Sequence, residues 1–229
     1  MKTHAASALF AGVVLFGPAW AAGASDYKHV NPSPQFKPIP EAEALVLAPE
    51  KLGKEPALSA AESRDLASGE VVTRPIPHDG AGKRYESFAL IKATPPEVMK
   101  VLKDYAHFTE IMPNLSKVEY TWDGNLAHVR EVVKVGLFKF DFWVTLMHYG
   151  DSCIEWEYDR GDLRDTTGYY KMFPREGGAA TLLIYHVYSD PGMALPGFII
   201  DLLSKSSMPK VLKAVRTEVS RRNSRDGGK

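Results

Sequence analysis

The sequence has little cysteine, no excess of charge of either sign and no long apolar run beyond its N-terminus. Cys153 is the single cysteine among 229 residues, so no internal disulfide can form and the fold must rest on its hydrophobic core. Its immediate neighbours are neither basic nor histidine, which favours a structural thiol over a reactive one. Lysine plus arginine and aspartate plus glutamate both number 28, so we expect no nucleic-acid partner.

Motifs for metal binding and catalysis are missing as well. His128, His148 and His186 are too widely spaced for a metal-ligand pattern. No glycine-rich loop follows a strand in the way that phosphate binding requires, and no serine lies in a nucleophile-elbow context. We therefore predict no metal and no cofactor, and the sequence identifies no catalytic residue.

The N-terminus has the features of an export signal. Lys2 gives a positive start, Ala5 to Phe16 is apolar, and Ala19-Trp20-Ala21 matches the small-x-small cleavage pattern. The apolar segment is short for a membrane span. We predict a cleaved signal peptide at residues 1–21 and a secreted protein, periplasmic in a Gram-negative source; an uncleaved anchor is the alternative.

The next segment, residues 22–57, is interpreted as an extended tether with little fixed structure. This rests on its prolines, which are Pro32, Pro34, Pro38, Pro40, Pro49 and Pro56. The folded domain is predicted to cover residues 58–223, and residues 224–229 to form a flexible tail.

Two helix starts can be recognised. Ser59 and Glu62 are spaced as a capping box, which predicts a short helix to about Ser68. Thr94-Pro95-Pro96-Glu97 combines a cap, an early proline and a returning glutamate, so a second helix begins there. A short amphipathic turn from Tyr105 to Met112 follows. Strands are expected at 70–74 and 84–92.

Consecutive hairpins follow, and their turns determine which side chains share a face. Asp123-Gly124 is interpreted as a two-residue turn that sets Trp122 opposite Asn125, and Gly136-Leu137 as a second such turn. Both turns gather apolar side chains on one face. That face comprises Val118, Tyr120, Val129, Val133, Phe138, Phe140, Phe142, Val144 and Leu146.

A three-residue turn, Gly150-Asp151-Ser152, extends the pattern and puts Ile154, Trp156 and Tyr158 on the apolar face. Two further strands are expected at 165–173 and 179–189. The pattern does not settle which of their faces is inward. The candidates are Tyr169, Tyr170, Leu182, Ile184, Tyr185 and His186.

The last long segment, Asp190 to Arg222, is predicted as a loop and a helix in two pieces. The second piece has one apolar stripe made of Met208, Leu212, Val215 and Val219. Pro209 means that the helix either restarts or kinks there. The first piece, with Phe198 and Leu202, is apolar nearly all round and is either core or a gate that opens against a membrane.

This order of elements predicts an α+β fold in which a curved antiparallel sheet wraps around the C-terminal helix. It resembles the START-like, helix-grip (SRPBCC) superfamily, and within it the polyketide cyclase/dehydrase and coenzyme Q-binding proteins. The resemblance covers roughly Leu58 to Arg222 and implies a lipid, isoprenoid, sterol or polyketide held between sheet and helix, with no shared catalytic motif. It rests on Ala93 to Val98, Asp104 to Pro113, Gly168-Tyr169-Tyr170, Thr181 to Tyr185, Asp190-Pro191-Gly192 and Leu195-Pro196.

One polar feature lies within the predicted apolar face. The turns put Glu131 beside Phe142, and Arg160 on the other side of the same ring if its strand extends that far. The two side chains then form either a polar anchor for a ligand head group or two solvated groups at the rim. A third reading is acid–base catalysis by a desolvated Glu131. On the opposite face, Arg130 is expected opposite Trp143.

We therefore predict an exported, soluble, monomeric carrier for a hydrophobic small molecule, with transient membrane contact. The alternatives are a cyclase or dehydratase acting on a polyketide-like substrate, and a protein-interaction module that uses the proline-rich segment. The predicted ligand-binding residues are Tyr120, Val129, Glu131, Val133, Phe140, Phe142, Val144, Trp156, Tyr158, Arg160, Tyr185, Phe198, Leu202 and Leu212.

Overall fold

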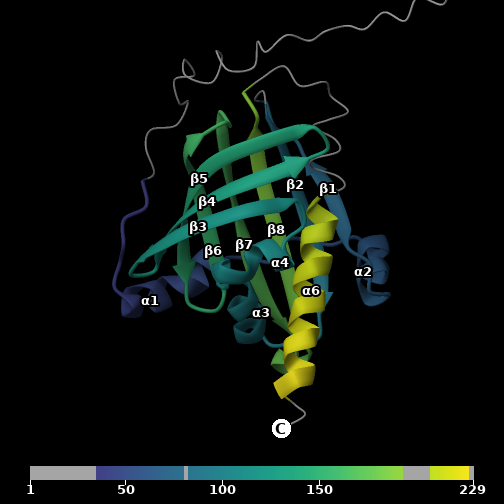
Figure 1. Ribbon diagram of the computed structural model, residues 1–229. Coiled ribbons are helices and arrows are strands. Elements are labelled where there is room, and N and C mark those ends of the chain that lie inside the picture. The colour runs from purple at the N-terminus through teal and green to yellow at the C-terminus, as the bar shows by residue number, and fades with distance from the viewer. Residues whose placement is uncertain (1–34, 80–81, 193–206, 227–229) are drawn as a thin grey trace, which may run out of the picture.

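The computed structural model describes residues 35–79, 82–192 and 207–226. Its centre is an eight-stranded antiparallel sheet in the order β1-β2-β8-β7-β6-β5-β4-β3, curved around the C-terminal helix α6 (Figure 1). The α+β helix-grip architecture is therefore confirmed. The strands are β1 (Val72–Ile76), β2 (Lys83–Ile91), β3 (Leu115–Asp123), β4 (Leu126–Val135), β5 (Phe138–Tyr149), β6 (Cys153–Gly161), β7 (Asp165–Arg175) and β8 (Ala180–Asp190).

The helices lie on both faces of this sheet. We call the face toward α6 the inner face and the opposite one the outer face. Both helix starts predicted from sequence are confirmed: the Ser59 and Glu62 side chains cap each other's backbone, and Glu97 accepts from the Thr94 N–H at 2.7 Å. The helices are α1 (Glu41–Leu52), α2 (Ala60–Ala67), α3 (Pro95–Leu102), α4 (Phe108–Ile111) and α6 (Ser207–Asp226), with short 3-10 turns η1 (Tyr105–His107) and η2 (Glu176–Gly178).

The hairpin registers mostly follow the predicted turns. Val135 lies opposite Phe138 and Tyr149 opposite Cys153, as the two later turns require. The first turn lies one residue later than predicted, at Gly124-Asn125, because Asp123 pairs with Leu126; Trp122 therefore pairs with Ala127 instead of Asn125, a register shift of two. A shift of two leaves every side chain on its predicted face, since side chains alternate with period two.

The proline-rich segment is not an extended tether over its described part. Glu41–Leu52 forms α1, which starts directly after Pro40 and packs on the outer face through Ala48. Proline was a misleading signal here: Pro40 stands at the N-cap, where no intrahelical N–H bond is needed, and most residues that follow are good helix formers, although Pro49 lies inside the helix. Cys153 is buried beneath α1, and burial raises the pKa of its thiol to about 12, which suits a structural thiol.

The C-terminal helix supplies the apolar stripe that the sequence predicts. Met208, Leu212, Val215 and Val219 are all buried. Pro209 falls in the first turn of α6, where it removes no intrahelical hydrogen bond. The far end of α6 is tied to the inner-face helices by Arg222, which donates to Asp104 at 2.6 Å. The expected first helical piece, with Phe198 and Leu202, lies outside the described residues.

Candidate functional site

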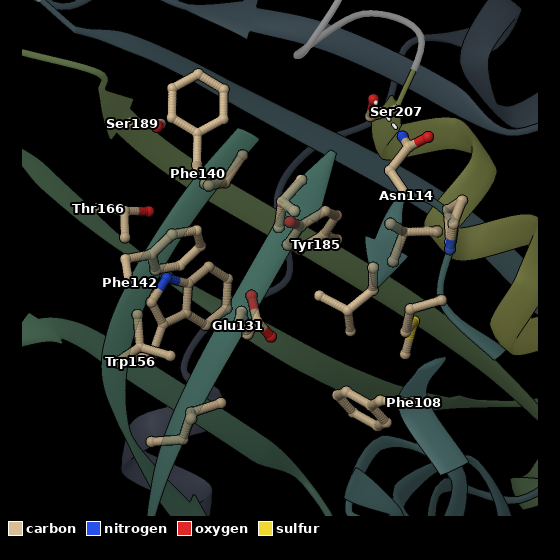
Figure 2. Close-up of a pocket in the computed structure, with 18 of the residues that line it drawn as sticks. Phe108, Asn114, Glu131, Phe140, Phe142, Trp156, Thr166, Tyr185, Ser189 and Ser207 are labelled. Atoms are coloured by element: carbon tan, nitrogen blue, oxygen red, sulfur yellow. Dashed lines mark hydrogen bonds between the residues drawn. The ribbon is translucent and has the colours of Figure 1, made fainter. Parts of the chain in front are cut away.

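A cavity of about 250 Å³ lies between the inner face and the first turn of α6. Its wall is mostly aliphatic and aromatic, and Figure 2 shows these side chains converging from neighbouring strands. A dry apolar cavity of roughly 150 Å³ binds benzene, so this one has room for a larger apolar group. The described lining residues include Leu102, Phe108, Met112, Val133, Val135, Phe140, Phe142, Val144, Leu146, Ile154, Leu163, Val187 and Val211.

Three aromatic rings form one side of the cavity. Tyr170 and Tyr185 stack with centroids 4.7 Å apart, and Trp156 lies 5.5 Å from the first and 5.9 Å from the second. Gly168 sits opposite Trp156, and a Cβ there would come within 2.2 Å of the indole. The glycine is therefore what allows the indole to lie close against β7.

These rings also settle the phase of the last two strands. Tyr170 and Tyr185 face the cavity, whereas Tyr169 and His186 stack with centroids 4.7 Å apart and share the outer-face surroundings of Glu86. The sequence left this open because both faces of β7 and β8 carry large apolar or aromatic side chains. Helix α2 and its neighbours cover the outer face there, so both faces are half-buried or buried.

Glu131 is the acidic residue on the cavity wall. It comes from the middle of β4, opposite Phe142 as predicted, and lies among the lining side chains in Figure 2. The residue keeps some accessible surface because it borders the cavity, yet apolar side chains surround it. No described residue donates a hydrogen bond to its carboxylate. Burial raises the pKa of Glu131 to about 7, from an ordinary value of 4.5.

A buried hydrogen bond links the cavity wall to a histidine behind it. Tyr105, from η1, lines the cavity and its hydroxyl lies 2.9 Å from Nε2 of His148. Nδ1 of His148 lies 3.1 Å from the backbone oxygen of Asn125, so Nδ1 carries the proton and Nε2 accepts from Tyr105. Burial lowers the pKa of His148 to about 4, which keeps this ring neutral. Sequence reasoning missed the pair because a loop residue and a strand residue meet only in the fold.

The predicted partnership of Glu131 with Arg160 is wrong. A bulge between Trp143 and Val144 shifts the β5–β6 register, so that Phe142 pairs with Gly161. Arg160 consequently points to the outer face, where its guanidinium lies 4.6 Å from the ring centroid of Trp143.

Arg130 lies opposite Trp143, as predicted. Its guanidinium donates to Asp141 and to Glu119, both at 2.8 Å, and thus joins a surface charge network. The guanidinium that lies over the Trp143 ring belongs to Arg160 instead.

Of the other predicted ligand-binding residues, some line the cavity and the rest do not. Val129, Tyr158 and Leu212 are buried in the core beside the cavity without lining it. Tyr120 is 40% exposed because β3 is an edge strand. Phe198 and Leu202 lie outside the described residues. The seven that line the cavity are Glu131, Val133, Phe140, Phe142, Val144, Trp156 and Tyr185, and their contact with a ligand stays a prediction.

Within 35–79, 82–192 and 207–226, no three His, Cys, Asp or Glu side chains are grouped so that they could hold a metal ion. Among the helices in those same ranges, none combines the length and the apolar character needed to cross a bilayer.

Known proteins resemble this chain in fold and in family signature. Among solved structures, an aromatase/cyclase, Zhui, from Streptomyces sp. R1128 superposes with a TM-score of 0.52 at 18% identity, covering 66% of this chain and 96% of that one. A fragment of a STAR-related lipid transfer protein from Xanthomonas axonopodis gives 0.56 at 16% identity, covering 66% and 93%. Human StAR-related lipid transfer protein 5 gives 0.55 at 16% identity, covering 67% and 84%.

These three likenesses are remote in sequence and concern the fold. No curated protein matches the sequence. The family described as "Polyketide cyclase / dehydrase and lipid transport" matches residues 91–216, which is more than half of the 229 residues and includes the cavity-lining strands. The chain therefore belongs to the polyketide cyclase/dehydrase and lipid transport family of the START-like superfamily.

Proposed function

We propose that this protein binds and carries a hydrophobic small molecule, a lipid or an isoprenoid, in the cavity between its sheet and α6. The observation that carries the proposal is the cavity itself, whose described wall combines aliphatic and aromatic side chains with one acidic group, Glu131. Each CH₂ group moved from water into such a space contributes about 0.8 kcal/mol, so a short chain or ring system binds without a dedicated motif. Lipid transfer proteins with the same fold support this reading.

Transient contact with a membrane fits the turn between β4 and β5. Leu137, at this turn, is fully exposed, and exposed Lys134 and Lys139 flank it. Val135 and Phe140, on the same hairpin, line the cavity. An apolar tip between two lysines is complementary to an anionic lipid surface, where each lysine contributes about 1 kcal/mol. We propose that the protein approaches such a surface with this hairpin.

Vesicle sedimentation tests the membrane contact. A Leu137→Ser variant and a Lys134→Ser/Lys139→Ser variant should each bind anionic phosphatidylserine vesicles more weakly than the wild-type protein. The matched control is Lys100→Ser, which changes an exposed lysine of α3 outside the cavity lining and should bind normally. Equal binding by all four proteins would remove the hairpin from the proposal.

The carrier function is tested by identifying the compound that the purified protein holds in its cavity. Protein purified from its own compartment under native conditions should release a stoichiometric hydrophobic compound, identified by native mass spectrometry and solvent extraction. A preparation that is empty and takes up no apolar compound from a lipid extract would contradict the proposal. The same fractionation tests the export that the N-terminal sequence predicts, since the mature chain should then lack residues 1–21.

A cyclase or dehydratase acting on a polyketide-like substrate is the second candidate. It is favoured by the placement of Glu131 on the apolar cavity wall, where burial raises the pKa of this carboxyl to about 7 and suits it to take and return a proton. Turnover of a polyketide-like ketone that disappears in Glu131→Gln would support this candidate. Binding of the same compound without any conversion would support the carrier.

A further inference from the structure

Glu131 is the group that decides which polar end a ligand can bring into the cavity. Its carboxyl lies on the inner face between Val129 and Val133, and the surrounding side chains in Figure 2 are mainly apolar or aromatic. Among the described residues, the titratable groups that interact with it are the phenols of Tyr105 on η1, Tyr170 on β7 and Tyr185 on β8. None of the described lining residues is lysine, arginine or histidine.

The phenol of Tyr105 is restricted in the hydrogen bonds that it can offer. Its proton is donated to His148, so toward the cavity its oxygen acts as an acceptor. Burial raises the pKa of Tyr105, Tyr170 and Tyr185, and the nearby Glu131 carboxylate adds to this effect, so these phenols stay neutral. They therefore supply no charge that would balance a charged ligand.

Charged ligands are disfavoured by the carboxyl in this setting. An anionic head group would have to share a low-dielectric space with Glu131, and two carboxylates in one site cannot both remain ionised. An ammonium head group would have to be desolvated and would force Glu131 to ionise, a pairing whose desolvation cost can exceed its Coulomb gain. A hydroxyl or carbonyl group brings no charge into the cavity.

An uncharged head group also matches the proton of Glu131. Burial raises the pKa of this carboxyl to about 7, so near neutral pH about half of the molecules hold a proton that can be donated to a ligand oxygen. In its contact with Glu131, a carbonyl group can use only this protonated form, whereas a hydroxyl group can also donate to the ionised form and to the oxygen of Tyr105.

We infer that the cavity selects an uncharged apolar molecule whose polar end is a hydroxyl or carbonyl group hydrogen-bonded to Glu131. The inference rests on the proposed carrier function and narrows its ligand class. It excludes free fatty acids, acyl phosphates and alkyl amines as the preferred cargo.

A head-group series with a constant chain tests the inference. Decan-1-ol, decan-2-one, decanoate and decylamine share a ten-carbon chain, and decane serves as the apolar reference. Their affinities are measured by competition against the uncharged dye N-phenyl-1-naphthylamine at pH 5.5, 7 and 8.5. The alcohol and the ketone should bind at least about tenfold more tightly than the acid and the amine, because a hydrogen bond replaces a buried charge.

The pH dependence assigns the hydrogen bond to Glu131. If only the protonated carboxyl can donate to the ketone oxygen, decan-2-one should bind up to about thirtyfold more weakly at pH 8.5 than at pH 5.5. Glu131→Gln should remove this pH dependence, since its amide keeps a donor at every pH. Glu110→Gln changes an exposed carboxyl outside the cavity lining and should retain the wild-type profile.

The outcomes distinguish a failure of the head-group selectivity from a failure of the carrier function. Decanoate or decylamine binding as tightly as decan-1-ol would overturn the inference and leave the carrier function standing. An unchanged pH profile in Glu131→Gln would overturn it as well. Failure of every compound, decane included, to bind at any pH would contradict the carrier function itself. The head-group series uses wild-type protein, so it decides the question even if a variant does not fold.

Discussion

Replacing Glu131 with glutamine should change how the stability of the empty protein depends on pH. The pKa of Glu131 rises from 4.5 in the unfolded chain to about 7 in the folded one, which corresponds to up to about 3 kcal/mol. The folded state holds the proton more tightly, so this contribution is fully present below pH 4.5. It is lost as the pH rises toward 7, and no further change is expected above about pH 8. Glutamine does not titrate, so the stability of the variant should not fall in this way as the pH rises.

The measurement is urea unfolding of both proteins at pH 4.5, 6, 7, 8 and 9, analysed as the difference in unfolding free energy. The difference between the two proteins is used because His148 titrates in the same pH range and changes the unfolding free energy in the opposite direction. Burial lowers its pKa from 6.5 to about 4, so its contribution is present above pH 6.5 and is lost as the pH falls through 4. Subtracting the variant cancels that slope.

Relative to wild type, Glu131→Gln should gain up to about 3 kcal/mol between pH 4.5 and pH 8. The exposed Glu110→Gln control should give a flat difference over the same range. A flat difference for Glu131→Gln as well would refute the reasoning, because it would mean that water in the cavity solvates the carboxylate as bulk water does.

Three other substitutions probe the site and its frame. Gly168→Ala should destabilise the protein by about 1–3 kcal/mol in urea unfolding, because the new Cβ would lie 2.2 Å from both the Trp156 indole and the backbone oxygen of His186; a neutral result would mean that both the indole and strand β8 move aside freely. Leu212→Ala, at a fully buried position of α6, should cost about 2–5 kcal/mol, and a smaller loss would show that α6 packs loosely. Arg160→Ala should leave ligand affinity unchanged and cost at most about 1 kcal/mol, because its guanidinium lies over Trp143 on the outer face; a clear loss of affinity in the dye competition would contradict that placement.

The faces of the strands could be predicted from sequence because side chains alternate strictly. The β3–β4 turn was misplaced by one residue, which shifts the pairing register by two, yet the apolar face was right, because only odd register shifts exchange the faces. The β5–β6 bulge at Trp143 is such an odd shift, and it moved Arg160 to the outer face. Nothing in the local pattern marks a bulge, since it arises from how two distant strands accommodate each other.

The remaining errors come from contacts between distant parts of the chain. Proline content predicted an extended segment at Glu41–Leu52, whereas burial of Ala48 against the outer face favours a helix there. The hydrogen bond between Tyr105 and His148 could not be anticipated, because it links a short turn to the end of a long strand. Glu131 was found because a single acidic residue interrupts an apolar face, which is a local signal.

The order of the strands has a consequence for how the protein is made. β2 pairs with β8, joining residues such as Ile91 and Thr181 that lie 90 positions apart in the chain. A growing polypeptide can form the hairpins from β3 to β7 as they emerge, but the first two strands must wait for the last one. The cavity between the sheet and α6 can therefore form only after β8 has been added, and a ligand cannot be enclosed before that step.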